Sequence, residues 1–371
     1  MRIGFLAPLK APTHPTPSGD RTMARRLLAA LHALGHETVL LSELRLRDGL
    51  GCPQIGAALA ARAAAEADRL LASEETRGLD ALFTYHSHYK APDRIGPVLA
   101  RRLGLPYLIA EPSYAPSRAH GPWAEGLAAA LAGLLVADAL LVMSARDRPA
   151  LARIVPPEIP LLDLPPFLGP EPPPPAPREG RPEGPTRLLT VAMMRRGAKL
   201  ESYVRLARAL GGLTGLPWTL DIAGEGPARE AVRAAFAPLG DRVRFHGLLE
   251  GPALARLHEG ADLFVWPGVA EGYGLAYLDA AAAGLPALAE AWPGPAGLVL
   301  DGVTGRLPPP GENAAFAGAL SALLDPAVRR PLGAEARRRA LTSHGFAAGM
   351  AGLAEALAAA NTQRRQVRIA S

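Results

Sequence analysis

The sequence predicts an α/β protein built from two doubly wound, parallel-sheet domains. Short apolar runs alternate with helix-type segments along the chain, which is typical of parallel sheets with crossover helices. A proline-rich stretch centred on residues 172–175 interrupts the alternation near the middle, and such a stretch forms an extended, stiff connector. At 371 residues the chain is long enough for two domains with a core each.

The first domain is expected over residues 1–165. Its strands are short runs of apolar residues, and its helices are longer alanine-rich and leucine-rich segments. The expected strands are Ile3–Ala7, Thr38–Leu41, Ala81–Tyr85, Tyr107–Ala110 and Ala139–Met143, and the expected helices are Arg21–Leu34, Ile55–Ala72, Ile95–Leu103 and Trp123–Val136.

A linker is expected over residues 166–186, and the second domain over residues 187–345. The same alternation continues there. The expected elements are the strands Arg187–Ala192, Thr219–Ala223, Val243–His246 and Leu263–Trp266, and the helices Leu200–Leu210, Ala228–Phe236, Leu254–Glu259 and Leu275–Ala283. A final apolar helix over residues 346–361 is expected to pack back on the first domain, and residues 362–371 to form a frayed, basic tail with solvated arginines.

Composition limits the class of protein. Hydrophobic residues make up 49% and charged residues 20% of the chain, as in a globular protein. The single cysteine, Cys52, excludes an internal disulfide and a cysteine metal cluster, and it indicates a reducing cytoplasm. No apolar run resembles a signal peptide or a membrane span. The net charge of +5 is small and no nucleic-acid-binding module is recognisable, so no nucleic-acid partner is expected.

The segment Glu271-Gly272-Tyr273-Gly274-Leu275, followed by Asp279, carries the most functional information. The glycines precede an alanine-rich segment, so free backbone N–H groups and the positive end of a helix dipole meet there. A diphosphate fits such a helix start, Asp279 can reach a vicinal diol such as a ribose, and Glu271 would face the sugar. The alternative is structural, because glycines before helices are common in α/β proteins and the dipole alone favours nearby acidic residues.

These residues resemble those of a known family. The segment 271–279, together with Ala283-Gly284-Leu285-Pro286 and the run from Asp301 to Leu307, is similar to retaining glycosyltransferases of the GT-B fold, most of all to glycosyltransferase family 4, the group 1 glycosyl transferases. The run Leu220 to Pro227 resembles the family's strand and its Gly-x-Gly-Pro turn. The resemblance implies two Rossmann-like domains facing across a cleft.

The resemblance also implies roles for individual residues. Lys199 and Arg195 would bind the donor diphosphate, whose charge grows as the glycosidic bond breaks, and Glu271 would position the donor sugar. These three residues are the expected catalytic set. The expected donor-binding residues are Gly19, Phe245, Gly247, Gly272, Tyr273, Gly274, Leu275 and Asp279, and the expected contacts with the acceptor or the sugar are Glu111, Arg118 and His120.

The chain departs from the family's pattern at three positions. Asp279 stands where a glutamate is usual, and the basic residue in the short motif before Lys199 is displaced to Arg195, with Arg196 as its solvated neighbour. Glu111 occupies the place after the fourth strand where many relatives have a histidine. Two nearby histidines, His86 and His88, are interpreted as structural.

The implied function is transfer of a sugar from a nucleoside diphosphate donor, with UDP or GDP as carrier, to an acceptor saccharide that is lipid-linked or small, with retention at the anomeric carbon. The nucleotide-sugar is a co-substrate; no cofactor and no metal are expected, because the sequence has no Asp-x-Asp. Two alternatives stay open. One is a GT-B epimerase or phosphorylase, and the other is a nucleotide-binding protein of this fold without turnover.

Membrane contact is a separate expectation for one helix. Arg21, Arg25 and Arg26 share a predicted helix with Leu27, Leu28 and Leu31, a mixture that also occurs on helices resting on anionic lipid. An ordinary amphipathic helix covering the sheet explains the same pattern. The expected location is therefore the cytoplasm, with a peripheral position at the inner face of the membrane as the second interpretation.

Overall fold

The computed structural model describes residues 1–173 and 184–370, with side chains up to residue 366. The chain forms two compact units: Met1–Pro170 with Phe346–Ser371 make unit 1, and Glu171–Gly345 make unit 2. Residues 174–183 of the predicted proline-rich linker lie outside the described residues.

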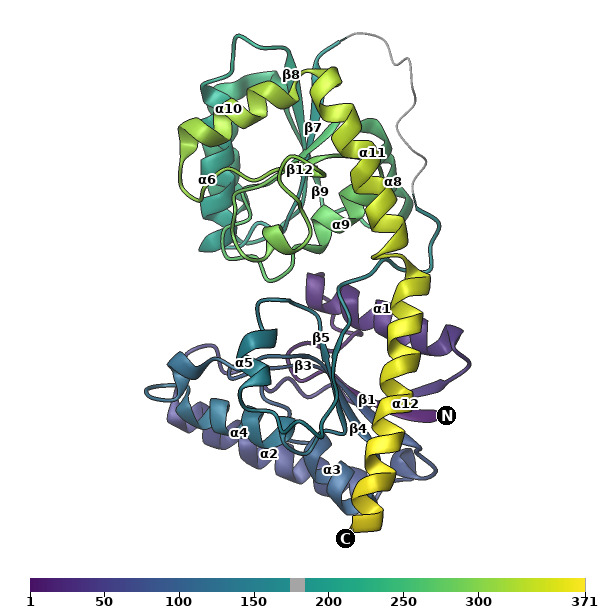
Figure 1. Ribbon diagram of the computed structural model, residues 1–371. Coiled ribbons are helices and arrows are strands. Elements are labelled where there is room, and N and C mark those ends of the chain that lie inside the picture. Colours follow the sequence, from purple (N-terminus) through teal and green to yellow (C-terminus); the bar gives the residue numbers. More distant parts are fainter. Residues whose placement is uncertain (174–183, 371) are drawn as a thin grey trace. The chain divides into compact units, whose positions relative to one another are not determined.

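Unit 1 contains a six-stranded, parallel sheet with strand order β2-β1-β3-β4-β5-β6 (Figure 1). Its elements are β1 (Arg2–Leu6), α1 (Gly19–Ala33), β2 (Glu37–Ser42), α2 (Pro53–Leu71), β3 (Ala81–Ser87), α3 (Gly96–Leu103), β4 (Tyr107–Pro112), α4 (Ala124–Leu134), β5 (Ala139–Val142), α5 (Arg148–Ala152), β6 (Leu161–Asp163) and α12 (Phe346–Ala370). Unit 1 also contains two short 3₁₀ turns: Glu74–Thr76 lies between α2 and β3, and Pro116–Arg118 lies between β4 and α4.

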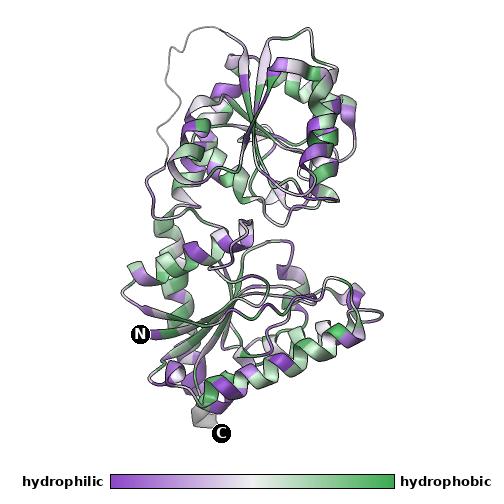
Figure 2. Ribbon diagram, turned by 180° about the vertical axis from the view of Figure 1, so that it is seen from behind, coloured by the Kyte–Doolittle hydropathy of each residue, from purple (hydrophilic) through white to green (hydrophobic). Residues whose placement is uncertain are grey.

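Helices cover both faces of this sheet. On one face lie α2, α3 and α4, whose apolar residues share a core with β3 and β4, and on the other lie α1 and α12 (Figure 1). The helix ribbons carry both hydrophobic and hydrophilic colours in Figure 2, as amphipathic helices do. Because the strands are covered on both faces, they are nearly continuous apolar runs, which is why the sequence predicts them well.

The helix α1 belongs to the core of unit 1. Leu27 and Leu31 are fully buried. Its arginines donate to backbone carbonyl groups: Arg21 to His14 O and Pro15 O, Arg25 to Pro12 O, and Arg26 to Phe167 O. The structure therefore favours the covering-helix interpretation, and it gives no support to the membrane interpretation of these residues.

The last helix corrects one expectation. It extends to Ala370, so the frayed tail predicted from residue 362 is wrong for residues 362–370. Arg364 is not solvated as expected, because its guanidinium donates to Ala100 O and Gly104 O and lies 3.9 Å from Asp138. These contacts tie the last turns of α12 to unit 1.

Unit 2 contains a second six-stranded, parallel sheet, with order β12-β11-β10-β7-β8-β9. Its elements are β7 (Thr186–Val191), α6 (Ala198–Gly211), β8 (Trp218–Ala223), α7 (Arg229–Phe236), the 3₁₀ segment Ala237–Arg242, β9 (Val243–Gly247), α8 (Gly251–Gly260), β10 (Leu263–Val265), α9 (Leu275–Ala282), β11 (Ala287–Leu288), the 3₁₀ turn Pro295–Gly297, β12 (Gly305–Arg306), α10 (Asn313–Leu323) and α11 (Pro326–Thr342). The prediction of two doubly wound, parallel-sheet domains is confirmed. Among the described residues, none of the helices combines the length and apolarity needed to cross a bilayer.

Candidate functional site

The predicted site residues Lys199 and Glu271 are 72 positions apart in the sequence, and they are in contact in unit 2. Lys199 lies in the first turn of α6 and Glu271 in the loop between β10 and α9. The Lys199 ammonium donates to Glu271 Oε1, and the Trp266 indole N–H donates to the same oxygen at 2.8 Å. Lys199 Nζ also lies 5.4 Å from the centre of the Trp266 ring. The Glu271 carboxylate is therefore held by a cation and an indole, with its side chain 14% exposed.

The backbone around Glu271 is shaped by close contacts that require glycine. Gly274 is the N-cap of α9 with φ 70°, which glycine adopts without strain. At Gly294 a Cβ atom would lie 2.2 Å from Glu271 O, so the loop carrying Gly294 packs directly on the Glu271 backbone. The predicted helix start is thus present, with Gly272 exposed in front of it.

The helix α6 is fixed to the same loop by one buried serine. Ser202 Oγ donates to Ala198 O at 2.9 Å and accepts from Val269 N at 3.0 Å. Ser202 is fully buried. These two hydrogen bonds join the first turn of α6, which carries Lys199, to the loop that carries Glu271.

Arg195 and Arg196 lie in the loop that leads from β7 into α6. Arg195 is half-buried and its carbonyl accepts from Leu200 N at 3.0 Å, whereas Arg196 is exposed. The neighbouring Gly-x-Gly-Pro turn holds this loop: a Cβ at Gly226 would lie 2.3 Å from Met194 O, and Met194 N donates to Glu225 O at 2.8 Å.

Two of the expected donor-binding residues, Phe245 and Gly247, lie on β9, an edge strand of the sheet. Phe245 packs against Phe236, and the Arg233 guanidinium lies 4.7 Å from the centre of its ring. Gly247 ends the strand with φ 71°. The Phe245 side chain is therefore used for packing.

Asp279 and Tyr273 lie on either side of the helix start. Both are half-buried, and Asp279 is on α9, where its charge raises the pKa of the buried His258 against the lowering effect of burial. The net shift of the His258 pKa is downward, so this histidine is neutral at neutral pH. The shorter carboxylate at position 279 thus has a neutral imidazole near it.

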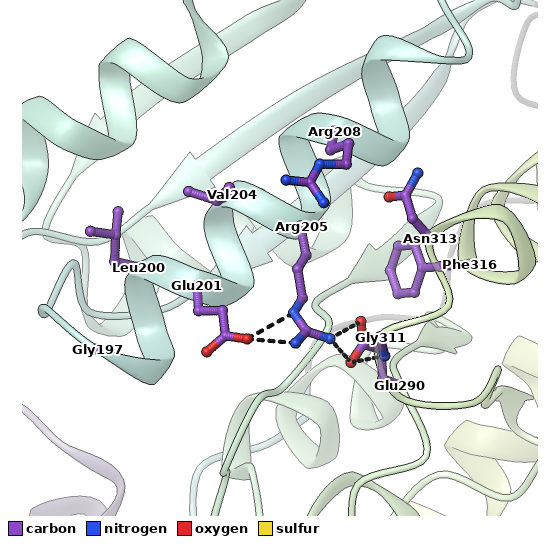
Figure 3. Close-up of a pocket in the computed structure, with 10 residues that line it drawn as sticks. All are labelled: Gly197, Leu200, Glu201, Val204, Arg205, Arg208, Glu290, Gly311, Asn313 and Phe316. Carbon is purple, nitrogen blue, oxygen red and sulfur yellow. Dashed lines mark hydrogen bonds and ion pairs between the residues drawn. The ribbon is translucent and has the colours of Figure 1, made fainter.

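A cavity of about 480 Å³ lies beside the first turn of α6 (Figure 3). Its lining residues are Gly197, Leu200, Glu201, Val204, Arg205, Arg208, Glu290, Gly311, Asn313 and Phe316, and none of them is a predicted donor-binding residue. Arg205 reaches between Glu201 and the buried Glu290, with Nη1 at 2.8 Å from Glu290 Oε2 (Figure 3). The same carboxylate accepts from Trp292 Nε1 and Gly311 N. Glu290 thus accepts from a guanidinium, an indole and a backbone N–H within unit 2.

In unit 1, the predicted residues Gly19 and Glu111 lie near a group of polar side chains that includes His86 and His88, the two histidines interpreted above as structural. Gly19 begins α1, and Ser18 caps this helix by accepting from Arg21 N. Asp20, in the first turn, contacts His86, with Oδ1 at 3.0 Å from Nδ1. Glu111 Oε2 lies 3.3 Å from the same nitrogen. We call Asp20, His86, His88 and Glu111 the polar cluster.

The polar cluster has strongly perturbed pKa values. Burial raises the pKa of Glu111 to about 8 although the His86 charge opposes this. Burial alone would lower the pKa of His86, but the Glu111 charge and the Asp20 hydrogen bond outweigh it and raise the value to about 9. Burial and the His86 charge hold the pKa of His88 well below its usual value. The raised pKa of His86 therefore keeps the Asp20–His86 ion pair at neutral pH, and the lowered pKa of His88 keeps that ring neutral.

These shifts predict that unit 1 loses stability as pH rises from 6.5 to 9. In this range folded Glu111 and His86 keep protons that they lose in the unfolded chain, whose pKa values are 4.5 and 6.5. Stability therefore falls as pH rises through the folded values, by about 1.4 kcal/mol per pH unit for each group that keeps its proton only in the folded state. Asp20 and His88, with lowered pKa values, change stability only below this range. Denaturant titrations at several pH values measure the effect; a Glu111→Gln variant with the same slope as the unsubstituted protein would contradict it.

The other predicted acceptor residues lie elsewhere on unit 1. Arg118 is exposed and its guanidinium lies 5.4 Å from the centre of the Trp123 ring and 5.7 Å from that of Tyr89. His120 is exposed in the turn that follows. The contact of His86 with Asp20 was not predicted from the sequence, although His86 follows a predicted strand, where sites of α/β proteins form.

In the described part of the chain, no three His, Cys, Asp or Glu side chains are arranged to hold a metal ion. This applies to the polar cluster as well, despite its two histidines and two carboxylates.

Comparison with known proteins relates unit 2 to sugar transfer. Residues 186–326 match the family model "Glycosyl transferases group 1". A D-inositol 3-phosphate glycosyltransferase of Arthrobacter sp. (strain FB24) is 37% identical over 111 residues, which are 30% of this chain and 26% of the relative. A phosphatidyl-myo-inositol mannosyltransferase of Mycobacterium leprae (strain TN) is 35% identical over 115 residues, 30% of this chain and 31% of the relative. The matches span less than a third of the length of either relative.

Solved structures share the whole fold. The sucrose-phosphate synthase of Thermosynechococcus elongatus has a TM-score of 0.73 at 21% identity, with all of both chains covered. A lipopolysaccharide outer core galactosyltransferase has a TM-score of 0.66 at 17% identity, with 96% of this chain and 99% of that chain covered. The prediction of the GT-B fold is thereby confirmed.

Proposed function

We propose that the protein transfers a sugar from a nucleoside-diphosphate-sugar to a hydroxylated acceptor, with retention at the anomeric carbon, because residues 186–326 match the family model "Glycosyl transferases group 1". The observation that carries this proposal is the contact of Lys199 with Glu271 in front of the helix start at Gly274. It combines a cation, the backbone N–H groups of a helix start and a positioned carboxylate, which are the groups that a departing diphosphate and a sugar need.

The residues have distinct proposed roles. Lys199, Arg195 and the start of α9 stabilise the diphosphate as negative charge develops on it. Glu271 hydrogen-bonds hydroxyl groups of the donor sugar, and Asp279 those of the ribose. The bond from the anomeric carbon to the diphosphate breaks, the bond to the acceptor oxygen forms, and the acceptor proton passes to the leaving phosphate. No metal and no cofactor take part in this scheme.

In the unliganded protein Lys199 and Glu271 neutralise each other. A bound diphosphate competes with Glu271 for the lysine, and the carboxylate is then available to the sugar. Donor binding thus rearranges an existing ion pair, and no new charge has to be buried without a partner.

Thermal unfolding in the presence of nucleotides tests the proposal. UDP, GDP and ADP, each with and without an attached sugar, are compared on the full chain, since a ligand of the folded state raises its stability. We expect UDP or GDP and its sugar to raise the unfolding temperature of unit 2. If no nucleotide does so, the proposed function is wrong. Sugar isomerised without an acceptor would identify an epimerase, and binding without any transfer or hydrolysis would identify a protein without turnover.

A further inference from the structure

Three side chains on one side of α6 bond to loops at the carboxyl ends of the strands in unit 2. Lys199, Ser202 and Arg205 are spaced three positions apart, so they are neighbours on the helix surface. The first two contact the loop after β10, as described above. Arg205 instead donates to both carboxylate oxygens of Glu290, in the loop after β11. The third contact thus joins α6 to a residue that the proposed reaction does not use.

The Glu290 carboxylate connects three segments of unit 2. It is buried, with the residue only 2% exposed. Arg205 Nη1 lies 3.0 Å from Oε1 and 2.8 Å from Oε2 (Figure 3). Oε2 also accepts from Trp292 Nε1 at 2.8 Å and from Gly311 N at 3.2 Å. The helix α6 and the loops after β11 and β12 therefore meet at one buried charge, where contacts hold more firmly than at the surface.

The backbone at Glu290 lies beside the loop that carries Glu271. Glu290 N donates to Pro267 O at 3.0 Å, which extends the pairing of β10 with β11 past the ends of both strands. Pro267 follows Trp266, whose indole donates to Glu271. Four positions after Glu290, the chain packs on the Glu271 backbone at Gly294. The loop after β11 therefore contacts the loop that carries Glu271 at two places.

We propose that Glu290 is a positioning residue for the contact of Lys199 with Glu271. Its carboxylate holds α6 through Arg205, while its backbone and the residues up to Gly294 hold the loop that carries Glu271. Glu290 thus fixes the elements that carry the lysine and the glutamate relative to each other. The effect on sugar transfer rests on the proposed function, whereas the geometry concerns unit 2 whether or not a donor binds.

The indole N–H signals of the full chain report on this geometry. The chain has four tryptophans, and their nuclear magnetic resonance signals can be assigned by single substitutions to phenylalanine. The Trp266 indole donates to Glu271, so its signal follows that contact. The Trp218 indole donates to Leu213 O, before the start of β8, and its signal is the control for the fold of unit 2.

Glu290→Gln breaks the link to α6 without changing the size of the side chain. Both oxygens of Glu290 accept from Arg205, so an NH₂ group faces the guanidinium in the variant. We expect the Trp266 signal to shift and the Trp218 signal to stay in place. Transfer should fall about tenfold to a hundredfold, as it does when reacting groups are slightly misplaced. An unshifted Trp266 signal, or transfer at the full rate, overturns the proposal.

Glu201→Gln is the matched control. This glutamate bonds to the same guanidinium, but it lies on α6 itself and its side chain is 51% exposed. The Trp266 signal and the rate of transfer should therefore change little. Equal effects of Glu201→Gln and Glu290→Gln would mean that only the charge next to Arg205 matters, and this would contradict the proposal.

The double variant Arg205→Met with Glu290→Gln separates positioning from stability. It contains no uncompensated charge at this place, so it should be more stable than Arg205→Met alone. Transfer should stay as low as in Glu290→Gln, because the link to α6 is still absent. Recovery of transfer together with stability would show that Glu290 only stabilises the fold, and would overturn the proposal.

The nucleotide measurements on the unsubstituted protein keep the two proposals apart. Absence of nucleotide binding rejects the proposed function, whereas the Trp266 signal of Glu290→Gln tests the positioning of Glu271 in either case.

Discussion

Replacing Lys199 by alanine should lower the rate of sugar transfer by about two to three orders of magnitude, as loss of a preorganised donor at a developing charge does elsewhere. Lys199 is the cation in direct contact with Glu271 at the start of α9, and the diphosphate gains charge as the glycosidic bond breaks. Nucleotide affinity should fall as well, because the lysine attracts the diphosphate in the ground state. Transfer rates and donor affinity, measured with the nucleotide-sugar found by thermal unfolding, check the prediction.

Arg196→Ala is the matched control. Arg196 is an exposed cation in the same loop, and its loss should change transfer by no more than a few-fold. Equal effects of the two substitutions would mean that only the general positive charge of this loop matters, and the assignment of Lys199 would then be wrong.

Glu271→Gln gives a second readout from the same ion pair. The amide no longer competes with phosphate for Lys199, so nucleotide diphosphates should bind as tightly as before or more tightly, while transfer falls. This combination is difficult to obtain from a folding defect, which would reduce both. Unchanged transfer in this variant would exclude Glu271 from sugar positioning.

Replacing Arg205 by methionine should destabilise unit 2 by about 3 kcal/mol, the lower part of the range for breaking a buried ion pair. Methionine keeps the apolar stem of the side chain but leaves the buried Glu290 carboxylate without its cation. Two further donors to Glu290, from Trp292 and Gly311, remain and limit the loss. Denaturant unfolding followed by tryptophan fluorescence measures the change.

Arg208→Met is the control for this prediction. Arg208 is exposed on the same helix and lines the same cavity, so its loss should change the free energy of unfolding by less than about 0.5 kcal/mol. Adding Glu290→Gln to Arg205→Met should restore part of the stability, because the uncompensated charge is removed. If the double variant is as unstable as the sum of the single ones, the pair is not coupled.

The strands that the sequence predicted share one physical property: they are continuous apolar runs between turns, as buried parallel strands are. The strands and helices that were not predicted from the sequence lack such a continuous apolar run. The strands β11 and β12 have only two residues each, and α11 carries an internal proline at position 331 and many arginines. The continuation of α12 depends on partners of Arg364 that are 226 to 264 residues away in the sequence, and local patterns contain no information on them.

The candidate site also has features that the local sequence predicts and contacts that it does not predict. Glycines and carboxylates at a helix start are a local pattern, so the segment 271–279 was recognisable. The contact of Glu271 with Trp266 and Lys199, and that of His86 with Asp20, join different loops. Those contacts follow from the order of the strands in each sheet, which the alternation of elements alone does not determine. The roles of these residues in binding and transfer stay predictions.

The return of α12 to unit 1 affects how the protein is made. This helix packs on α1, β4, β5 and β6, with Leu353, Ala356 and Leu357 buried, yet it is translated after the whole of unit 2. One face of the first sheet therefore stays partly uncovered while the ribosome synthesises the intervening residues. Nascent chains in this interval expose apolar surface, which makes them substrates for chaperones and prone to aggregation. Slow translation of unit 2 should therefore lower the yield of folded protein, because the incomplete unit 1 then exposes apolar surface for longer.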